Sequence, residues 1–201
     1  GTTIRGRLRG LQRGIGMTES ARFSTSIVDP VSSDVPGAVE IGFDKGAHAN
    51  CSSLLWGNLE RNPDKVAITG PMGTQSYREL IAEAARWGNA FKRAGLSRGE
   101  RIAFFIDDTP VFPAAFYGAV RSGFVPVLLN IQTKPDVLNY FLSDSAARFA
   151  LVEADLTGVF GEETLKDTKL EQLIIANGTS AASISVASEV FLDGAATSLD
   201  A

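Results

Sequence analysis

Two adjacent acids, Asp107 and Asp108, have a type and spacing that could support metal or phosphoryl chemistry. They follow the apolar run RIAFFI, residues 101–106, which predicts a strand buried on both faces. A receiver-type Mg²⁺ site would need a further aspartate on a later strand and a lysine, yet the strand predicted at 148–153 ends in Glu153. A D-x-D phosphoryl-transfer motif is excluded because the acids are adjacent. We favour the interpretation that Asp107 and Asp108 bind no ligand and lie beside a helix N-terminus, where the helix dipole stabilises negative charge.

Few other residues could act in catalysis or bind a metal ion or a phosphate group. The single cysteine, Cys51, and the single histidine, His48, lie three residues apart in a predicted loop, a spacing that does not favour a nucleophile–base pair. One histidine and one cysteine also exclude a zinc site built on those ligands. The sequence TGPMGT, residues 69–74, falls inside a predicted hairpin rather than between a strand and a helix, which argues against phosphate binding. We therefore predict no catalytic residue and no metal site.

The composition excludes several classes of function. A net charge of −4 offers no basic surface to nucleic acid or to an anionic membrane. A single cysteine cannot form an internal disulfide, so we expect a reducing, cytoplasmic location. The long apolar stretch 112–130 contains Pro113, Gly123 and Pro126, which one membrane-spanning helix would not tolerate. We predict instead a buried helix followed by a strand.

The chain divides into three regions. Residues 1–22 contain five arginines and one acid, and we expect a disordered leader. A mitochondrial presequence is the alternative, although the glycines of this segment would break an amphipathic helix. Residues 23–47 are rich in Ser, Pro, Gly and Asp and predict an extended arm. Residues 48–201 are expected to fold.

The folded region is predicted to begin with a helix, a hairpin and a second helix. The first helix spans 51–61, with four apolar side chains on one face: Leu54, Leu55, Trp56 and Leu59. Residues 65–68 and the turn at 70–73 predict the hairpin. Ser76 and Glu79 form an S-x-x-E capping box at the start of the second helix, and Gly95 is placed to end it.

Strands and helices then alternate. Buried strands are predicted at 101–106, 125–129, 148–153 and 170–176. A helix over 110–122 is predicted to be capped by Thr109 and ended by Gly123. A shorter helix opens at Lys134 and Pro135 and should turn three side chains inward: Val137, Leu138 and Phe141.

This order predicts an α/β fold, a largely parallel sheet flanked by helices on both faces, with an N-terminal arm, helix and β-hairpin. Ligands of such sheets gather at the carboxyl ends of the strands. The candidate positions at that edge are Asp107, Asp108 and residues 130–134.

Four stretches together resemble the N-terminal region of AMP-forming acyl-CoA synthetases: NLERNPDKVAI, SYRELIAEAARWGNAFKRAGLSRGERIAFF, FPAAFYGAVRSGFVPVLLN and YFLSDSAARFALVE. The first and third stretches, through NLERNPDKVA and FPAAFYGAVRSGFVPV, are similar to benzoate and hydroxybenzoate CoA ligases in particular. The resemblance implies an enzyme that uses ATP and Mg²⁺ to activate a small carboxylic acid as its adenylate and then transfers the acyl group to CoA.

The family's phosphate loop, [ST]-S-G-[ST]-T-G-x-P-K, does not occur in the 201 residues. We therefore expect residues 48–201 to be the N-terminal subdomain of the large adenylation lobe, a fragment that is inactive and binds no cofactor alone. In related ligases the loop after the VPVLLN strand can carry a basic residue near the CoA phosphates. Gln132 takes that position here, and Lys134 could supply the charge. Two alternatives remain: a free-standing α/β ligand-binding or regulatory module, and a remnant that self-associates through the surface left by the missing lobe.

Overall fold

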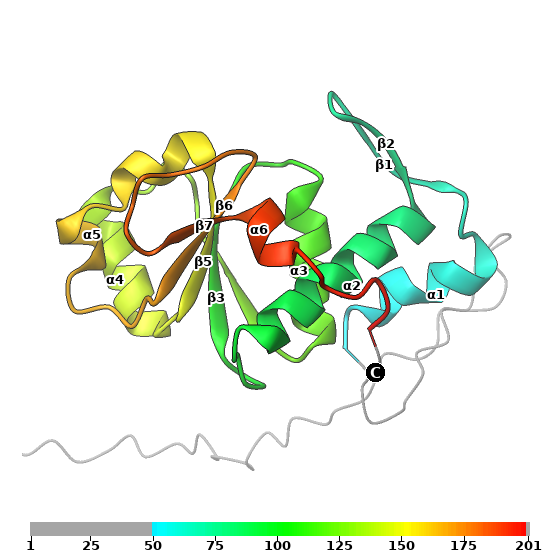
Figure 1. The fold of residues 1–201 in the computed structure, drawn as a ribbon, viewed down its shortest axis with the longest axis horizontal. Coiled ribbons are helices and arrows are strands. Elements are labelled where there is room, and N and C mark those ends of the chain that lie inside the picture. Colours follow the sequence, from blue (N-terminus) through cyan, green and yellow to red (C-terminus); the bar gives the residue numbers. More distant parts are fainter. Residues whose placement is uncertain (1–49, 200–201) are drawn as a thin grey trace, which may run out of the picture. The chain divides into compact units, whose positions relative to one another are not determined.

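Helices and strands alternate through residues 50–199, the part of the chain that the computed structural model describes (Figure 1). In chain order the elements are α1 (Ser53–Arg61), β1 (Val66–Gly70), β2 (Gly73–Ser76), α2 (Tyr77–Arg93), β3 (Arg101–Phe105), α3 (Val111–Arg121), β4 (Val125–Leu128), α4 (Pro135–Ser145), β5 (Phe149–Glu153), the 3₁₀ helix η1 (Ala154–Val159), α5 (Glu162–Leu165), β6 (Gln172–Ala176), β7 (Ser185–Ala187) and α6 (Ser188–Leu192). The predicted leader and arm, residues 1–47, lie outside the described residues, as does His48.

Five strands form a parallel sheet in the order β4-β3-β5-β6-β7, and β1 and β2 form a separate antiparallel hairpin. The predicted α/β fold with its hairpin is confirmed. The apolar stretch 112–130 becomes α3 and β4, and within residues 50–199 no helix has the length and apolar character needed to cross a membrane. The sequence did not predict η1, α5, β7 or α6, which are short and carry little periodicity.

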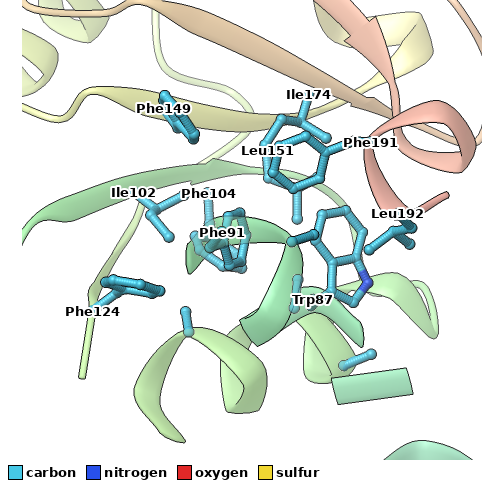
Figure 2. Close-up of a cluster of buried hydrophobic side chains, with 14 of the residues drawn as sticks. Trp87, Phe91, Ile102, Phe104, Phe124, Phe149, Leu151, Ile174, Phe191 and Leu192 are labelled. Carbon is cyan, nitrogen blue, oxygen red and sulfur yellow. The ribbon is translucent and has the colours of Figure 1, made fainter. Parts of the chain in front are cut away.

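Helices cover both faces of the parallel sheet. On one face α2, α3 and α6 pack against Ile102, Phe104 and Leu151, and on the other face α4 packs against Phe105 and Val152. Figure 2 shows the first of these cores, where aromatic rings from distant parts of the chain converge. The ring of Phe91 lies 5.6 Å from that of Phe191 and 6.1 Å from that of Phe124, centroid to centroid.

Both ends of α2 are fixed by local chemistry, as predicted. Ser76 Oγ accepts a hydrogen bond from the Glu79 backbone N–H, and Glu79 Oε2 accepts one from the Ser76 N–H at 2.8 Å. The Ser76 N–H, followed by its hydroxyl, lowers the pKa of Glu79. At the other end Gly95 adopts a φ of 87°, and Leu96 N–H reaches back to the Phe91 carbonyl. This Schellman arrangement stops the helix.

The helices α2 and α3 approach closely because both present a glycine at their crossing. A Cβ added to Gly88 would lie 2.8 Å from the Gly118 carbonyl oxygen. A Cβ added to Gly118 would collide with the Ala84 carbonyl oxygen. The two glycines therefore let the backbones touch directly, which brings both helices down onto the sheet.

Two predictions about side chains were wrong. Thr109 does not cap α3: Pro110 holds the N-cap position, and the buried Thr109 Oγ1 has no hydrogen-bond partner among the described residues. The reason is that the chain already turns at this point, since Thr109 N–H donates to the Asp107 carbonyl. In α4, Leu138 is buried as predicted, whereas Val137 and Phe141 are 42% and 38% exposed. Leu142 takes the inward position instead, because it lies one turn after Leu138.

The first helix is also less buried than its apolar stripe suggested. In α1 only Leu55 is fully buried, while Leu54 and Leu59 are exposed and Trp56 is half-buried. The guanidinium of Arg121 lies over the Trp56 ring at 5.3 Å. This face of α1 is therefore covered partly by a cation–π contact rather than by apolar packing.

The strand β4 was predicted to be buried but forms an edge of the sheet. Val125 is 46% exposed and Leu128 is 55% exposed. The N–H groups of Val125 and Leu129 point toward β3, donating to the carbonyls of Glu100 and Phe104. Because N–H directions alternate along a strand, the backbone nitrogen of Pro126 points to the open edge. The N–H that proline lacks would make no hydrogen bond to β3 there.

The amino ends of three strands are tied together by one arginine. Arg148 donates to Glu100 at 2.9 Å and to Glu171 at 2.7 Å, and also to the Gly95 carbonyl. The hydrogen bonds from Arg148 lower the pKa of Glu171. Each of these charged residues lies just before a strand, so the network fixes β3, β5 and β6 at the amino edge of the sheet.

The segment after β7 is held to α2 through its backbone. Arg93 donates to the carbonyls of Phe191 and Asp193 at 2.6 and 2.7 Å. Asn89 donates to the carbonyls of Ala196 and Ser198 at 2.9 and 2.7 Å. We call this set of contacts the α2 clasp. Its donors are side chains and its acceptors are main-chain oxygens.

Candidate functional site

The strand order defines where a ligand would bind in a sheet of this type. The chain passes from β3 outward to β4, and then returns to the other side of β3 to form β5. The switch point, where ligands of open parallel sheets bind, therefore lies between the carboxyl ends of β3 and β5. Asp107 follows β3 there, Glu153 ends β5, and Asn177 follows the neighbouring strand β6.

The surroundings of Glu153 at this edge raise the pKa of its carboxyl group. Asn177 Nδ2 donates to Glu153 Oε1 at 2.6 Å, whereas Oε2 is buried and no residue within 50–199 satisfies the hydrogen-bond criteria with it. Burial raises the pKa of Glu153, and the nearby carboxylates of Asp155 and Asp107 raise it further, while the Asn177 hydrogen bond opposes them. A carboxyl group in this setting holds its proton to higher pH than an exposed glutamate does.

The side chain of Asp107 stabilises the local turn, and that of Asp108 lies exposed beside it. Asp107 Oδ1 accepts from the Asp108 backbone N–H at 2.8 Å, and the exposed Asp108 makes no other hydrogen bond within residues 50–199. The helix α3 begins at Val111, so both acids lie just before its N-terminus, as we favoured. In this described part of the chain, no group of three or more His, Cys, Asp or Glu side chains is arranged to hold a metal ion.

The loop after β4 carries the two residues that the resemblance assigned to CoA. Asn130 Oδ1 accepts from the Gln132 N–H at 2.9 Å, which folds the loop back on itself. Lys134 is the extended N-cap residue of α4 and is followed by Pro135. The side chains of Gln132 and Lys134 are both exposed at the carboxyl edge of the sheet. Within residues 50–199 no ion pair joins Lys134 to the acids that follow β3 and β5.

A groove of about 320 Å³ opens beside the ends of β6 and β7. Arg86 lines it and pairs with Glu83 at 2.9 Å, and Asn177 and Ser188 line it from the strand ends. The side-chain oxygen Oε1 of Gln75, another lining residue, is buried and accepts no hydrogen bond from the residues that the structure describes. Sequence reasoning missed Asn177, although the Asn-Gly pair directly after a predicted strand signals a left-handed residue, and Asn177 has a φ of 56°.

The arrangement of these elements can be compared with known proteins. The family model described as AMP-binding enzyme matches residues 55–198. The chain belongs to this family. Its members include the proteins that the four sequence stretches resembled, so that resemblance is confirmed.

Two relatives from bacteria illustrate the similarity. The chain is 40% identical over 99 residues to the 3-hydroxybenzoate–CoA ligase of Aromatoleum sp. (strain CIB), covering 49% of this chain and 19% of the relative. It is 39% identical over 114 residues to the 4-hydroxybenzoate–CoA/benzoate–CoA ligase of Rhodopseudomonas palustris, covering 57% and 21%. The matches thus span about a fifth of the length of these curated relatives.

A solved structure agrees with the sequence matches. A benzoate CoA ligase from Burkholderia xenovorans LB400 superimposes with a TM-score of 0.63 and 29% sequence identity. The superposition covers 72% of this chain and 28% of that enzyme. The parallel sheet and its flanking helices are therefore part of the architecture of this AMP-binding enzyme family.

Proposed function

We propose that this chain is the N-terminal subdomain of an AMP-forming aryl- or acyl-CoA ligase. Such an enzyme converts a carboxylic acid, ATP and CoA into acyl-CoA, AMP and pyrophosphate through an acyl-adenylate. The match of the AMP-binding family model to residues 55–198 carries the proposal. The 40% identity to a 3-hydroxybenzoate–CoA ligase supports an aromatic acid as the substrate.

A chimera tests the proposed activity. The whole chain replaces the region that it matches in the Burkholderia xenovorans benzoate CoA ligase, which is 28% of that enzyme. We expect benzoate-dependent release of AMP and formation of benzoyl-CoA by the purified chimera. A chimera that folds, as judged by a cooperative thermal transition, but forms no adenylate would contradict the proposal.

In this proposal ATP and Mg²⁺ are held by the rest of the enzyme. The switch point of the described sheet presents the acids Asp107, Glu153 and Asp155, and like charges repel a polyphosphate. Titration calorimetry of the 201-residue chain with MgATP should show no micromolar binding. Micromolar affinity would favour the alternative of a free-standing ligand-binding module. The cytoplasmic location and the self-association remain predictions.

Lys134 is proposed to contact the phosphates of CoA, with Gln132 beside it as a neutral hydrogen-bonding neighbour. The exposed position of Lys134 after the carboxyl end of β4 supports this role, because a flexible ammonium there can reach a bound anion. In the chimera Lys134→Glu should raise the KM for CoA about three- to tenfold, while benzoyl-adenylate formation stays unchanged.

The matched control is Lys169→Glu. Lys169 is also exposed but lies before β6, at the amino ends of the strands rather than at their carboxyl ends. This variant should leave the KM for CoA unchanged. Equal effects of the two substitutions, or no effect of either, would remove Lys134 and Gln132 from the CoA site.

A further inference from the structure

The edges of the parallel sheet and of the β1–β2 hairpin differ in the features that hinder pairing with another strand. An open strand edge is a template for pairing with another strand, and proteins commonly block it with proline, charge or a very short strand. The parallel sheet follows this rule: Pro126 faces the open edge of β4, and β7 at the other edge is only three residues long. Each edge of this sheet therefore carries a feature that disfavours pairing with a further strand.

The hairpin β1–β2 lacks those features. Its strands, VAITG and GTQS, contain no proline and no charged residue, and no third strand within residues 50–199 pairs with them. A bulge lies near the base, between Val66 and Ile68, which leaves Ile68–Gly70 in regular register with Gly73–Gln75. Figure 1 shows the hairpin extending from the start of α2. A two-stranded hairpin is marginally stable in water unless another element supports it.

Apolar surface surrounds the hairpin. Met72 at its turn is 66% exposed, and Val66 near its base is 50% exposed. A groove of about 480 Å³ runs between the hairpin tip and the loop before α3, lined mainly by apolar residues: Ile68, Pro71, Met72, Pro110, Phe112 and Pro113. Thr109 also lines this groove, and its buried hydroxyl has no hydrogen-bond partner in the part of the chain from 50 to 199.

We propose that the free edge of the β1–β2 hairpin docks an extended strand from the rest of the adenylate-forming enzyme, and that this strand places apolar side chains in the groove beneath the hairpin tip. This inference rests on the proposed function. We infer the occupant from length, because about four-fifths of each curated relative lies outside the match and is available to supply such a strand. Strand addition to an open edge supplies main-chain hydrogen bonds, and the groove supplies side-chain contacts.

Hydrogen–deuterium exchange tests the docking without relying on activity. In the 201-residue chain alone, the amides of Ile68–Gly70 and Gly73–Gln75 should exchange much faster than those of the central strands β3 and β5. In the chimera with the benzoate CoA ligase, the hairpin amides should slow by at least about tenfold, because a strand now covers the edge. Fast exchange of the hairpin in a folded chimera would overturn the proposal, whether or not the chimera is active.

A pair of substitutions with matched exposure tests the groove. Met72 and Val190 are both 66% exposed, but Val190 lies on α6 and lines no part of this groove. Met72→Lys should return the hairpin of the chimera to fast exchange, whereas Val190→Lys should leave it protected. In the chain alone neither substitution should change the thermal transition, because neither side chain is buried there.

The remaining outcomes separate the possible occupants. Protection of the hairpin that rises with the concentration of the isolated chain would identify a second copy as the occupant and overturn the proposal. Protection in the isolated chain on adding benzoate would identify a small-molecule site and overturn it too. A protected hairpin in an inactive chimera supports the docking while the proposed function fails, so the two ideas are separable.

Discussion

The five-stranded sheet and the hairpin differ in how completely their apolar side chains are buried within the described residues. In the sheet, Phe104 and Phe105 on successive positions of β3 are both fully buried, because helices cover both faces. In the hairpin, Ala67 and Ile68 pack against the core, whereas Val66 is 50% exposed and Met72 is 66% exposed. The difference teaches that the sheet is stabilised by contacts within residues 50–199, whereas the hairpin has surface suited to a further partner.

The largest expected effect tests whether the sheet core alone determines stability. Phe91 is fully buried against rings from α6 and from the start of β4, so Phe91→Ala should lower the free energy of unfolding by about 3–5 kcal/mol. Val66→Ala in the hairpin should change it by less than about 0.5 kcal/mol. Urea denaturation of the 201-residue chain measures both. Similar losses for the two variants would break the comparison.

The next largest effect comes from comparing a glycine-to-alanine substitution in the helices that cover the sheet with one in the hairpin. Gly118→Ala should destabilise the protein by about 1–3 kcal/mol, because the added Cβ meets the backbone of α2. Gly70→Ala in the hairpin introduces a Cβ with no atom within 4 Å and requires no left-handed backbone, so it should be tolerated. The midpoints of thermal unfolding should therefore fall for the first variant only. A tolerated Gly118→Ala would mean that α2 and α3 can separate at little cost.

The smallest effect concerns pH. The strands of the hairpin contain no titratable side chain, whereas Glu153 at the sheet edge has a pKa raised by burial above its ordinary value of 4.5. Its ionised form therefore costs stability above the folded pKa, and this cost vanishes as the pH falls below 4.5.

Glu153→Gln removes that charge and keeps an oxygen to accept from Asn177. It should stabilise the chain by no more than about 1 kcal/mol at neutral pH, since the site is partly solvated. The gain should disappear near pH 4. Thermal unfolding measured at several pH values provides the test, and a gain that grows toward acidic pH would reverse the assigned sign.

Local signals in the sequence predicted local structure well. The Ser76–Glu79 box and the glycines at 95 and 123 were placed correctly, because caps depend on residues within a few positions of one another. Thr109 failed as a cap since Pro110 took that position, a choice decided by the preceding turn.

Properties that depend on strand order could not be predicted. The apolar run that forms β4 reads as a buried strand, and only the order of strands places it at an edge where Pro126 fits. At the candidate site, Asp107 was assigned to the correct edge from the end of its strand. The partnership of Glu153 with Asn177 was not predicted, because their residues lie 24 positions apart and meet only when β5 and β6 pair.

The α2 clasp has a consequence for how this protein can diverge. Arg93 and Asn89 donate hydrogen bonds to main-chain carbonyl oxygens, and every amino acid supplies such an oxygen. The four acceptors belong to Phe191, Asp193, Ala196 and Ser198. The attachment therefore places no demand on which side chains follow α6. Substitutions among residues 193–198 should therefore leave these four hydrogen bonds in place, although Gly194, with a φ of 67°, still requires a residue that tolerates a left-handed backbone.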